Sequence, residues 1–278
     1  MTNFAASFKN KRVLITGAGR GIGKRLAIGF AAHGARIGLL ARSKAELDLA
    51  QLEIEHAGGL ALRLRADVRD FDQVSAAADR MRVHFGSVDV LVCAAGVLGP
   101  LGSLAEISPK AWEEAVATNL LGVMHAGRAV LPGMIERRAG KIIALAGSGS
   151  AAPRPNFSAY AASKAALVRF VECLAEEVRE HNVQVNSMAP GGTYTSTTDE
   201  ILRAGEKAAG WQEIEEASRL RLTGGTQPDK QIQLALFLAS ERSNHISGKL
   251  IMVTDDWKKL EHATLHPDAY TLRRAQKV

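Results

Sequence analysis

The chain has 278 residues, 46% hydrophobic and 23% charged, a composition typical of a globular protein with one or two cores. No apolar run reaches the roughly 18 to 20 residues that cross a bilayer, and the start, MTNFAASFKNKR, has no apolar stretch suited to secretion, so we expect a cytoplasmic protein with no membrane partner. The formal net charge is +6, but lysine and arginine are spread along the chain without a long basic run, so we expect no nucleic-acid partner either.

Short apolar segments alternate along the chain with helical patterns. The first segment, Arg12–Thr16, leads at once into a glycine cluster, as a buried strand does when it enters a turn. Ser43 and Glu46 have the spacing of a capping box at a helix start, and Pro109 and Pro228 mark two further helix starts. Strands are expected at residues 12–16, 35–40, 60–65, 88–93, 141–145, 183–188 and 250–253. This alternation predicts an α/β fold, a single doubly wound parallel sheet with helices on both faces, because parallel strands need crossovers that pass over a face of the sheet.

The stretch from about residue 192 to 225 interrupts this rhythm. It mixes threonine, glycine, charged residues and one tryptophan, and we interpret it as a substrate lid. We expect one domain over residues 1–257 that includes this lid, followed by a tail over 258–278 that carries Tyr270, Arg273 and Arg274.

The two cysteines, Cys93 and Cys173, lie in apolar stretches and have neither paired nor metal-ligand spacing. We therefore expect two buried free thiols, no disulfide and no metal site.

A glycine-rich segment, Thr16-Gly17-Ala18-Gly19-Arg20-Gly21-Ile22-Gly23, lies between an expected strand and an expected helix. Glycines at this junction let the backbone turn tightly and approach a pyrophosphate at the N-terminus of the helix. The segment predicts a Rossmann-type dinucleotide site in which Gly17, Arg20, Gly21, Ile22 and Gly23 contact the cofactor.

The second motif is Tyr160-Ala-Ala-Ser-Lys164, about 140 residues further on. Together, Thr-Gly-x-x-x-Gly-x-Gly and Tyr-x-x-x-Lys resemble the paired signature of the short-chain dehydrogenase/reductase family, and the chain is similar to its 3-oxoacyl-acyl-carrier-protein reductases. The resemblance runs from about Val13 to Val253. It implies an oxidoreductase that transfers a hydride between a nicotinamide and a carbonyl or secondary alcohol, in other words a ketoreductase. It also implies a homodimer or homotetramer, formed through the helix that carries Leu167, Phe170, Val171 and Leu174.

Tyr160 and Lys164 are four residues apart and so lie on one face of a helix. A nearby ammonium favours the phenolate, so Tyr160 could give a proton to a carbonyl oxygen or take one from an alcohol. The resemblance implies that Lys164 also holds ribose hydroxyls of the nicotinamide half. It further implies that Asn119 connects the lysine to solvent in a proton relay.

The cofactor is expected to be NADP(H). The position at the end of the second strand that would grip the adenosine ribose is Ala41 instead of an acid, and Arg42, Arg20 and Ser43 can all bond a 2′-phosphate. By resemblance, the remaining cofactor contacts are Asp67, Val68, Ala95, Gly96, Asn119, Tyr160, Lys164, Pro190, Gly191, Thr193 and Thr195.

The chain departs from the family at the serine that polarises the substrate carbonyl. The usual position, thirteen residues before the tyrosine, is Gly147, and the neighbouring Ser148 and Ser150 both offer a hydroxyl. Ser148 is the nearer candidate, because the glycines around it permit a one-residue shift. A second departure is Cys93-Ala94-Ala95-Gly96 in place of Asn-Asn-Ala-Gly, which removes polar side chains expected to brace the sheet.

Substrate identity stays open between an acyl-carrier-bound 3-oxoacyl group, a sugar or nucleotide-sugar carbonyl, and a hydroxylated ring compound. Two other classes of function are a nicotinamide-binding regulator without turnover and an epimerase or dehydratase that uses the nicotinamide transiently. A regulator has no need of the tyrosine and lysine, whereas an epimerase would share them.

Overall fold

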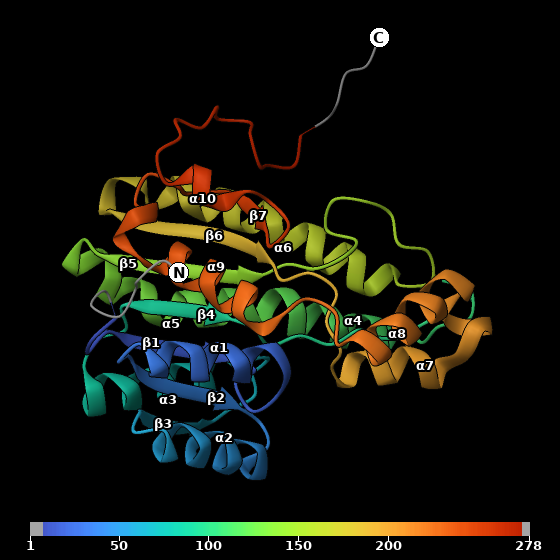
Figure 1. The fold of residues 1–278 in the computed structure, drawn as a ribbon, viewed down its shortest axis with the longest axis horizontal. Coiled ribbons are helices and arrows are strands. Elements are labelled where there is room, and N and C mark those ends of the chain that lie inside the picture. The colour runs from blue at the N-terminus through green and yellow to red at the C-terminus, as the bar shows by residue number, and fades with distance from the viewer. Residues whose placement is uncertain (1–7, 274–278) are drawn as a thin grey trace.

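The computed structural model describes residues 8–273, which contain seven parallel strands in one sheet with helices on both faces (Figure 1). The strand order is β3-β2-β1-β4-β5-β6-β7. The strands are β1 (Arg12–Thr16), β2 (Arg36–Ala41), β3 (Leu60–Arg65), β4 (Val90–Cys93), β5 (Gly140–Leu145), β6 (Val183–Ala189) and β7 (Leu250–Met252). Their ends differ from the expected ones by no more than two residues, and the predicted doubly wound fold is confirmed.

Each face of the sheet has its own apolar core, built from its own set of helices. The helices of the first face are α1 (Gly21–Ala32), α2 (Lys44–His56), α9 (Pro228–Ala239) and α10 (Trp257–Leu260). Those of the second face are α3 (Phe71–Phe85), α5 (Gly122–Arg137) and α6 (Ser158–Glu177). Because the chain leaves β1 toward β2 on one side and β4 lies on the other, the sheet has a switch point at the carboxyl end of β1, where such folds form a crevice.

Helix starts follow local chemistry. The Ser43 hydroxyl accepts a hydrogen bond from the backbone N–H of Glu46, as the capping spacing predicts. Helix α4 (Pro109–Val116) begins with Pro109 after Ser108, and α9 begins with Pro228, as expected. Between α4 and α5 the chain forms a π-helix, η1 (Ala117–Leu121), a distortion that occurs often at functional sites.

The segment interpreted as a lid consists mainly of two helices, α7 (Ser196–Ala209) and α8 (Trp211–Thr223), which extend from one end of the molecule (Figure 1). A small apolar cluster attaches them to the body. Its buried members are Leu98, Phe157, Ile201, Ala209 and Ala217. These two helices therefore pack directly on the segment that precedes α6.

The C-terminal segment runs along the edge of the sheet beside β7. The N–H of Leu250 donates to the carbonyl oxygen of Tyr270, and Glu172 of α6 pairs with Arg273. Arg274 lies outside the described residues, as do residues 1–7 of the chain start. No helix between residues 8 and 273 is long and apolar enough to span a membrane.

Two expectations about α6 have different outcomes, since that of an oligomer stays untested and that of a buried Cys173 is wrong. Leu167, Val171 and Leu174 face the sheet and are buried within the single chain, so they give no reason for an interface, and the predicted oligomer stays a prediction. Cys173 is exposed, because it lies on the opposite side of the same helix, whereas Cys93 at the end of β4 is buried as expected.

Candidate active site

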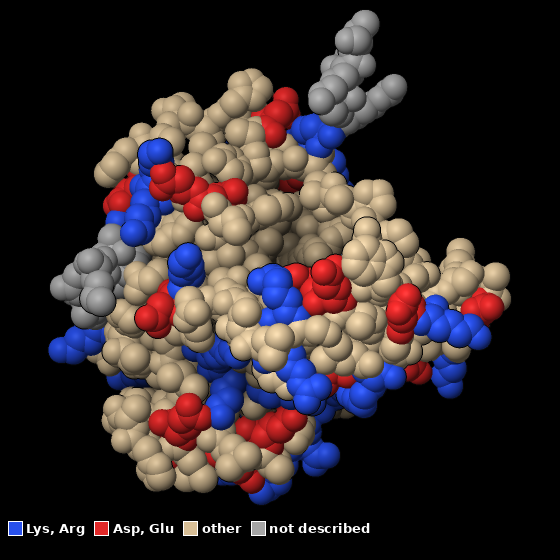
Figure 2. All heavy atoms as spheres, turned by 45° about the vertical axis from the view of Figure 1, so that its right-hand side comes forward, with Lys and Arg blue, Asp and Glu red and all other residues tan. Residues whose placement is uncertain are grey.

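A cavity of about 900 Å³ opens at the carboxyl ends of the central strands. Figure 2 shows that this face of the molecule is hollowed and that basic and acidic side chains lie close together around the hollow. All but one of the residues predicted to contact cofactor or substrate line this cavity, from the glycine turn and Arg42 at one end to Ser148, Tyr160 and Lys164 at the other. The exception is Asn119, which lies behind the wall.

The glycine turn brings two backbone segments closer than side chains would allow. Gly17 has φ of +67°, and a Cβ there would lie 2.7 Å from the Cα of Ala95. A Cβ on Gly23 would lie 2.3 Å from the carbonyl oxygen of Gly17. The turn thus leaves the N-terminus of α1 open to the cavity, with a geometry that suits a pyrophosphate.

The segment Cys93-Ala94-Ala95-Gly96 is braced without the asparagines of the family pattern. The N–H of Ala95 donates to the hydroxyl of Thr16 at 3.2 Å, and Thr16 is buried at the end of β1. The bracing hydrogen bond therefore comes from the neighbouring strand through Thr16.

The end of β2 carries the groups that could hold an adenosine ribose. Ala41, Arg42 and Ser43 line the cavity, and the Ser43 hydroxyl still has its proton to donate, because its cap bond uses the oxygen as acceptor. Arg20 approaches Glu46 at 3.5 Å, although both side chains are largely open to solvent. Glu46, expected only as a residue of the helix start, also lines the cavity.

Asp67 and Val68 follow β3 at the same edge. Arg69 donates four hydrogen bonds to the Asp67 carboxylate, three from its guanidinium at 2.7 to 3.1 Å and one from its backbone N–H at 3.0 Å, and it lowers the pKa of that acid. Arg42 lies 4.0 Å from the same carboxylate. Asp67 is therefore a fixed anion at the rim, and the loop around Val68 is further held by His125, whose ring bonds the Val68 carbonyl.

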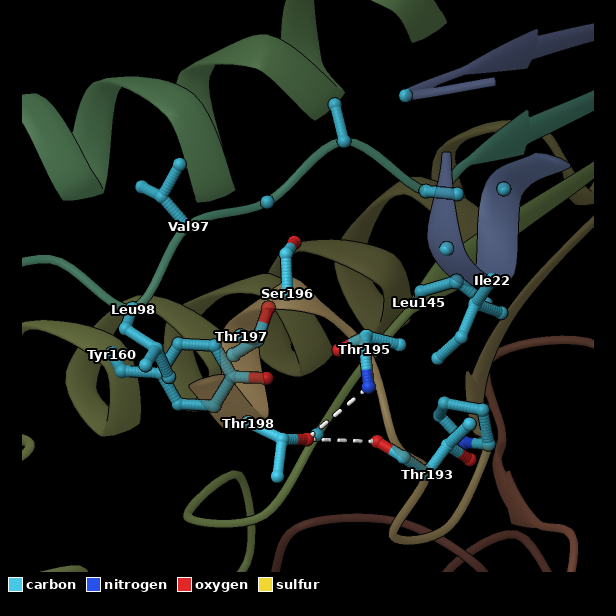
Figure 3. Close-up of a pocket in the computed structure, with 18 of the residues that line it drawn as sticks. Ile22, Val97, Leu98, Leu145, Tyr160, Thr193, Thr195, Ser196, Thr197 and Thr198 are labelled. Atoms are coloured by element: carbon cyan, nitrogen blue, oxygen red, sulfur yellow. Dashed lines mark hydrogen bonds between the residues drawn. The ribbon is translucent and has the colours of Figure 1, made fainter. Parts of the chain in front are cut away.

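Tyr160 and Lys164 both project from the first turns of α6 into the cavity. In Figure 3 the Tyr160 hydroxyl points toward the open space between the loop that contains Val97 and the segment that contains Thr195. Lys164 is buried, its Nζ donates to the carbonyl of Leu145 at 2.6 Å, and burial lowers its pKa to about 8. The ammonium lies 5.8 Å from the centre of the Tyr160 ring.

Burial raises the pKa of Tyr160 above its usual value, and the positive charge that opposes this effect is that of Arg154. Sequence spacing points to Lys164 for this role, and it overlooks Arg154 altogether. Arg154 comes from the loop between β5 and α6 and forms a two-pronged ion pair with Glu213 of α8. One sequence alone carries no signal for this pair, because the two residues are far apart along the chain and only the packing of α8 brings them together.

Asn119 occupies the π-helix and is fully buried. Its side chain accepts from the N–H of Val97 and donates to the carbonyl of Val97 and the hydroxyl of Ser163. Its Oδ1 and the Nζ of Lys164 both lie against Gly96, within 3.6 Å of where a Cβ would stand. Asn119 thus holds the cavity wall directly behind the lysine.

The loop after β5 separates the two candidate serines. Ser148 lines the cavity, whereas Ser150 is buried and does not. Beside them, Gly147 lies against the tyrosine, since a Cβ at this position would be 2.3 Å from the Tyr160 hydroxyl.

The opposite wall is made by the segment after β6. Pro190 and Gly191 line the cavity, and Thr198 bonds both the carbonyl of Thr193 and the N–H of Thr195, as the dashed lines in Figure 3 show. These bonds fix the start of α7 against the cavity. Within residues 8–273, no group of three or more His, Cys, Asp or Glu side chains is placed to hold a metal ion.

Comparisons with known proteins agree with this geometry. The sequence pattern of the family described as short chain dehydrogenase matches residues 11–205. The 2,3-dihydro-2,3-dihydroxybenzoate dehydrogenase of Bacillus subtilis is 34% identical over 249 residues, which are 87% of this chain and 94% of that protein. The gluconate 5-dehydrogenase of Gluconobacter oxydans is 33% identical over 247 residues, covering 89% and 94%. A gluconate 5-dehydrogenase from Burkholderia cenocepacia, solved with NADP and tartrate, has a TM-score of 0.78 at 30% identity and covers 91% of this chain and 96% of its own.

Proposed function

The chain belongs to the short-chain dehydrogenase/reductase family of oxidoreductases that act on alcohols and carbonyls, and from this premise we propose that it is an NADP(H)-dependent ketoreductase with Tyr160 as its proton donor and acceptor. The observation that carries the proposal is the single cavity that the glycine turn, Tyr160 and Lys164 share. Such a cavity can hold a dinucleotide at one end and a small carbonyl compound at the other.

The adenosine end supports NADP(H) over NAD(H). An NAD-type acid at the end of β2 would bond the ribose hydroxyls and repel a 2′-phosphate, and Ala41 offers neither effect. Arg42 is exposed enough to turn toward a phosphate, and Ser43 can donate to it. Arg20 would join them on leaving Glu46.

Nicotinamide supplies the hydride when the cofactor is bound, and a side chain of the protein has to donate or accept the proton. We infer that the Tyr160 hydroxyl donates its proton to the carbonyl oxygen during reduction and takes it back during oxidation. Lys164, with a pKa of about 8, carries a positive charge at neutral pH 5.8 Å from the ring centre of Tyr160, and we infer that it adds to the charge of Arg154 in favouring the phenolate that remains. Its other donors are available to ribose hydroxyls.

Two further residues would support this step. Ser148 would donate to the developing oxyanion from the cavity wall, a role for preorganised donors next to reacting carbonyls. Asn119 would keep the loop at Val97 in place behind Lys164 and connect the lysine to solvent.

The two other classes of function predict different behaviour. A nicotinamide-binding regulator would bind NADPH without consuming it, and an epimerase or dehydratase would convert substrate without net cofactor use. The tyrosine and lysine beside the cofactor cavity favour turnover over pure sensing.

The proposal is tested by following NADPH absorbance with a panel of acyl thioesters, sugar carbonyls, cyclic ketones and keto acids, and NADP⁺ reduction with the matching alcohols. We expect cofactor consumption with at least one member. Tight NADPH binding without consumption, while product forms from substrate, would instead support an epimerase.

A further inference from the structure

Arg154 connects the lid to the proposed catalytic tyrosine. Its Nε and Nη2 donate to the two carboxylate oxygens of Glu213, both at 2.7 Å. Its guanidinium carbon lies 3.9 Å from the ring centre of Phe157 and 5.5 Å from that of Tyr160. One guanidinium therefore contacts the lid on one side and faces the tyrosine ring on the other.

This contact is held on both sides by packing. The side chain of Arg154 is 12% exposed, so solvent screens its charge only weakly. Phe157 is fully buried in the apolar cluster that anchors the lid helices, and Tyr160 packs against the same cluster. The position of α8 thus determines whether Glu213 can reach Arg154.

The electrostatic consequence depends on which charges surround the phenol. The charged groups that line the cavity near it are Lys164 of its own helix, Arg154 of the preceding loop, Glu200 of α7, and Glu213 and Glu216 of α8. Among them, Arg154 opposes the rise in the pKa of Tyr160 that burial causes. A carboxylate bound to the guanidinium weakens its field at the ring, since opposite charges at contact distance largely cancel.

We propose that Arg154 is a positioning residue for Tyr160, and that Glu213 of the lid controls how strongly its charge acts on the phenol. With α8 in place, the ion pair holds the guanidinium beside the ring, and the carboxylate of Glu213 weakens the electric field of the guanidinium at the phenol. Movement of α8 away from the loop releases Glu213 and leaves the full charge of Arg154 beside the tyrosine. The state of the lid is in this way connected to the proton affinity of the group that moves the proton.

This inference rests on the proposed function only in giving Tyr160 a catalytic role, and its test does not need a substrate. The full-length chain is subjected to rapid jumps to alkaline pH, and phenolate absorbance is recorded before the chain unfolds. The same chain with Tyr160→Phe is subtracted to remove Tyr194 and Tyr270, which leaves the titration of Tyr160. The variants are Arg154→Met, Arg154→Lys and Glu213→Gln, with Glu215→Gln as the matched control on an exposed position of α8.

The two partners should shift the Tyr160 midpoint in opposite directions. Arg154→Met removes the favourable charge and should raise the midpoint by about one pH unit, whereas Arg154→Lys should leave it close to that of the unaltered chain. Glu213→Gln frees the guanidinium of its counter-charge and should lower the midpoint by roughly half a unit. Glu215→Gln should have no effect.

A purely structural ion pair gives a different pattern. If both partners only hold the loop in place, Arg154→Met and Glu213→Gln shift the midpoint in the same direction, and the proposal is overturned. An unchanged midpoint in Glu213→Gln overturns it as well, and this variant keeps every apolar contact of the lid. If the chain turns over an alcohol, the pH midpoint of kcat/KM should follow the same opposite shifts. Absence of turnover with every substrate would reject the proposed function, while the titration would still decide the coupling.

Discussion

The hydroxyl of Tyr160 fills the space beside Gly147, where a Cβ atom would lie only 2.3 Å from the phenol oxygen and 3.1 Å from the ring carbon that carries it. Gly147 is also the position, thirteen residues before the tyrosine, at which the family usually has its serine. In this chain the tyrosine therefore takes the room that a side chain at position 147 would need.

Restoring the family residue should accordingly impair the enzyme. We predict that Gly147→Ser lowers kcat at least tenfold, because the new side chain must displace the hydroxyl that transfers the proton. NADPH affinity, measured by fluorescence titration, should change little. Gly127→Ala serves as the control, since a Cβ at this helical glycine meets no atom within 4 Å. A Gly147→Ser protein as active as the unaltered chain would show that position 147 can hold the serine after all.

The role of that serine should belong to Ser148, which lines the cavity, and not to the buried Ser150. A hydroxyl that donates to a developing oxyanion is commonly worth a few kcal/mol of barrier. Ser148→Ala should therefore lower kcat at least tenfold at unchanged NADPH affinity, and Ser150→Ala should have a smaller effect. The reverse ranking in steady-state kinetics would reassign the role.

Substitutions of Tyr160 and Lys164 should have different effects on turnover and on cofactor binding. Tyr160→Phe keeps the ring and loses only the transferable proton, so turnover should disappear while NADPH still binds. Lys164→Ala should weaken both, because it removes the charge near the phenol and the donors to the ribose. Cofactor binding is measured by calorimetry and turnover by absorbance. An active Tyr160→Phe protein would mean that another group supplies the proton.

Sequence patterns predict the frame of this molecule well. The strands are short and apolar, so their ends could be located, and the glycine turn follows from the backbone approach that only glycine permits. All but one of the predicted site residues line one cavity because parallel strands end at the same edge of the sheet. The exception is Asn119, which lies behind the cavity wall because it is part of the π-helix. The sequence pattern does not predict this distortion of the helix.

The sequence patterns do not predict contacts between segments that are far apart along the chain. Glu46 comes into the proposed cofactor cavity because α2 packs beside α1, and Glu213 meets Arg154 because α8 packs on the loop before α6. Cys173 shows the same limit on a single helix. Apolar neighbours in the sequence do not show which side of a helix faces the sheet. Cys173 lies on the side that faces solvent.

Cofactor preference should depend on a balance between Arg42 and Glu46. Arg42→Asp places an acid beside the ribose and should reverse the preference from NADPH to NADH, with the ratio of kcat/KM values changing by a factor on the order of 100. Glu46→Gln releases Arg20 and removes a negative charge, so it should lower the KM for NADPH and leave that for NADH unchanged. An unchanged NADPH-to-NADH ratio in both variants would count against a 2′-phosphate site here.

A buried lysine far from the proposed chemistry should limit stability in a pH-dependent way. Lys141 of β5 is 8% exposed, its Nζ lies 3.4 Å from the Ser243 hydroxyl, and burial lowers its pKa from 10.5 to about 7, with Glu241 opposing the shift. Between about pH 7 and 10.5 the unfolded chain binds more protons at this group than the folded chain does. The free energy of unfolding contributed by this group therefore rises with pH across that window, and below it the folded chain bears the full cost of a buried ammonium.

Lys141→Met keeps the length of the side chain without the charge. We predict that it raises the free energy of unfolding by about 5 kcal/mol below pH 7, since a pKa shift of one unit corresponds to about 1.4 kcal/mol. This gain should shrink as the pH rises through the window and approach zero only above pH 10.5, where the lysine is neutral in the folded and the unfolded state. Urea unfolding at both ends of the window measures the difference. Lys230→Met, at an exposed position of α9, is the control and should show no such trend. A gain of the same size at every pH would mean that the methionine acts by packing and that the charge of Lys141 costs the folded chain nothing.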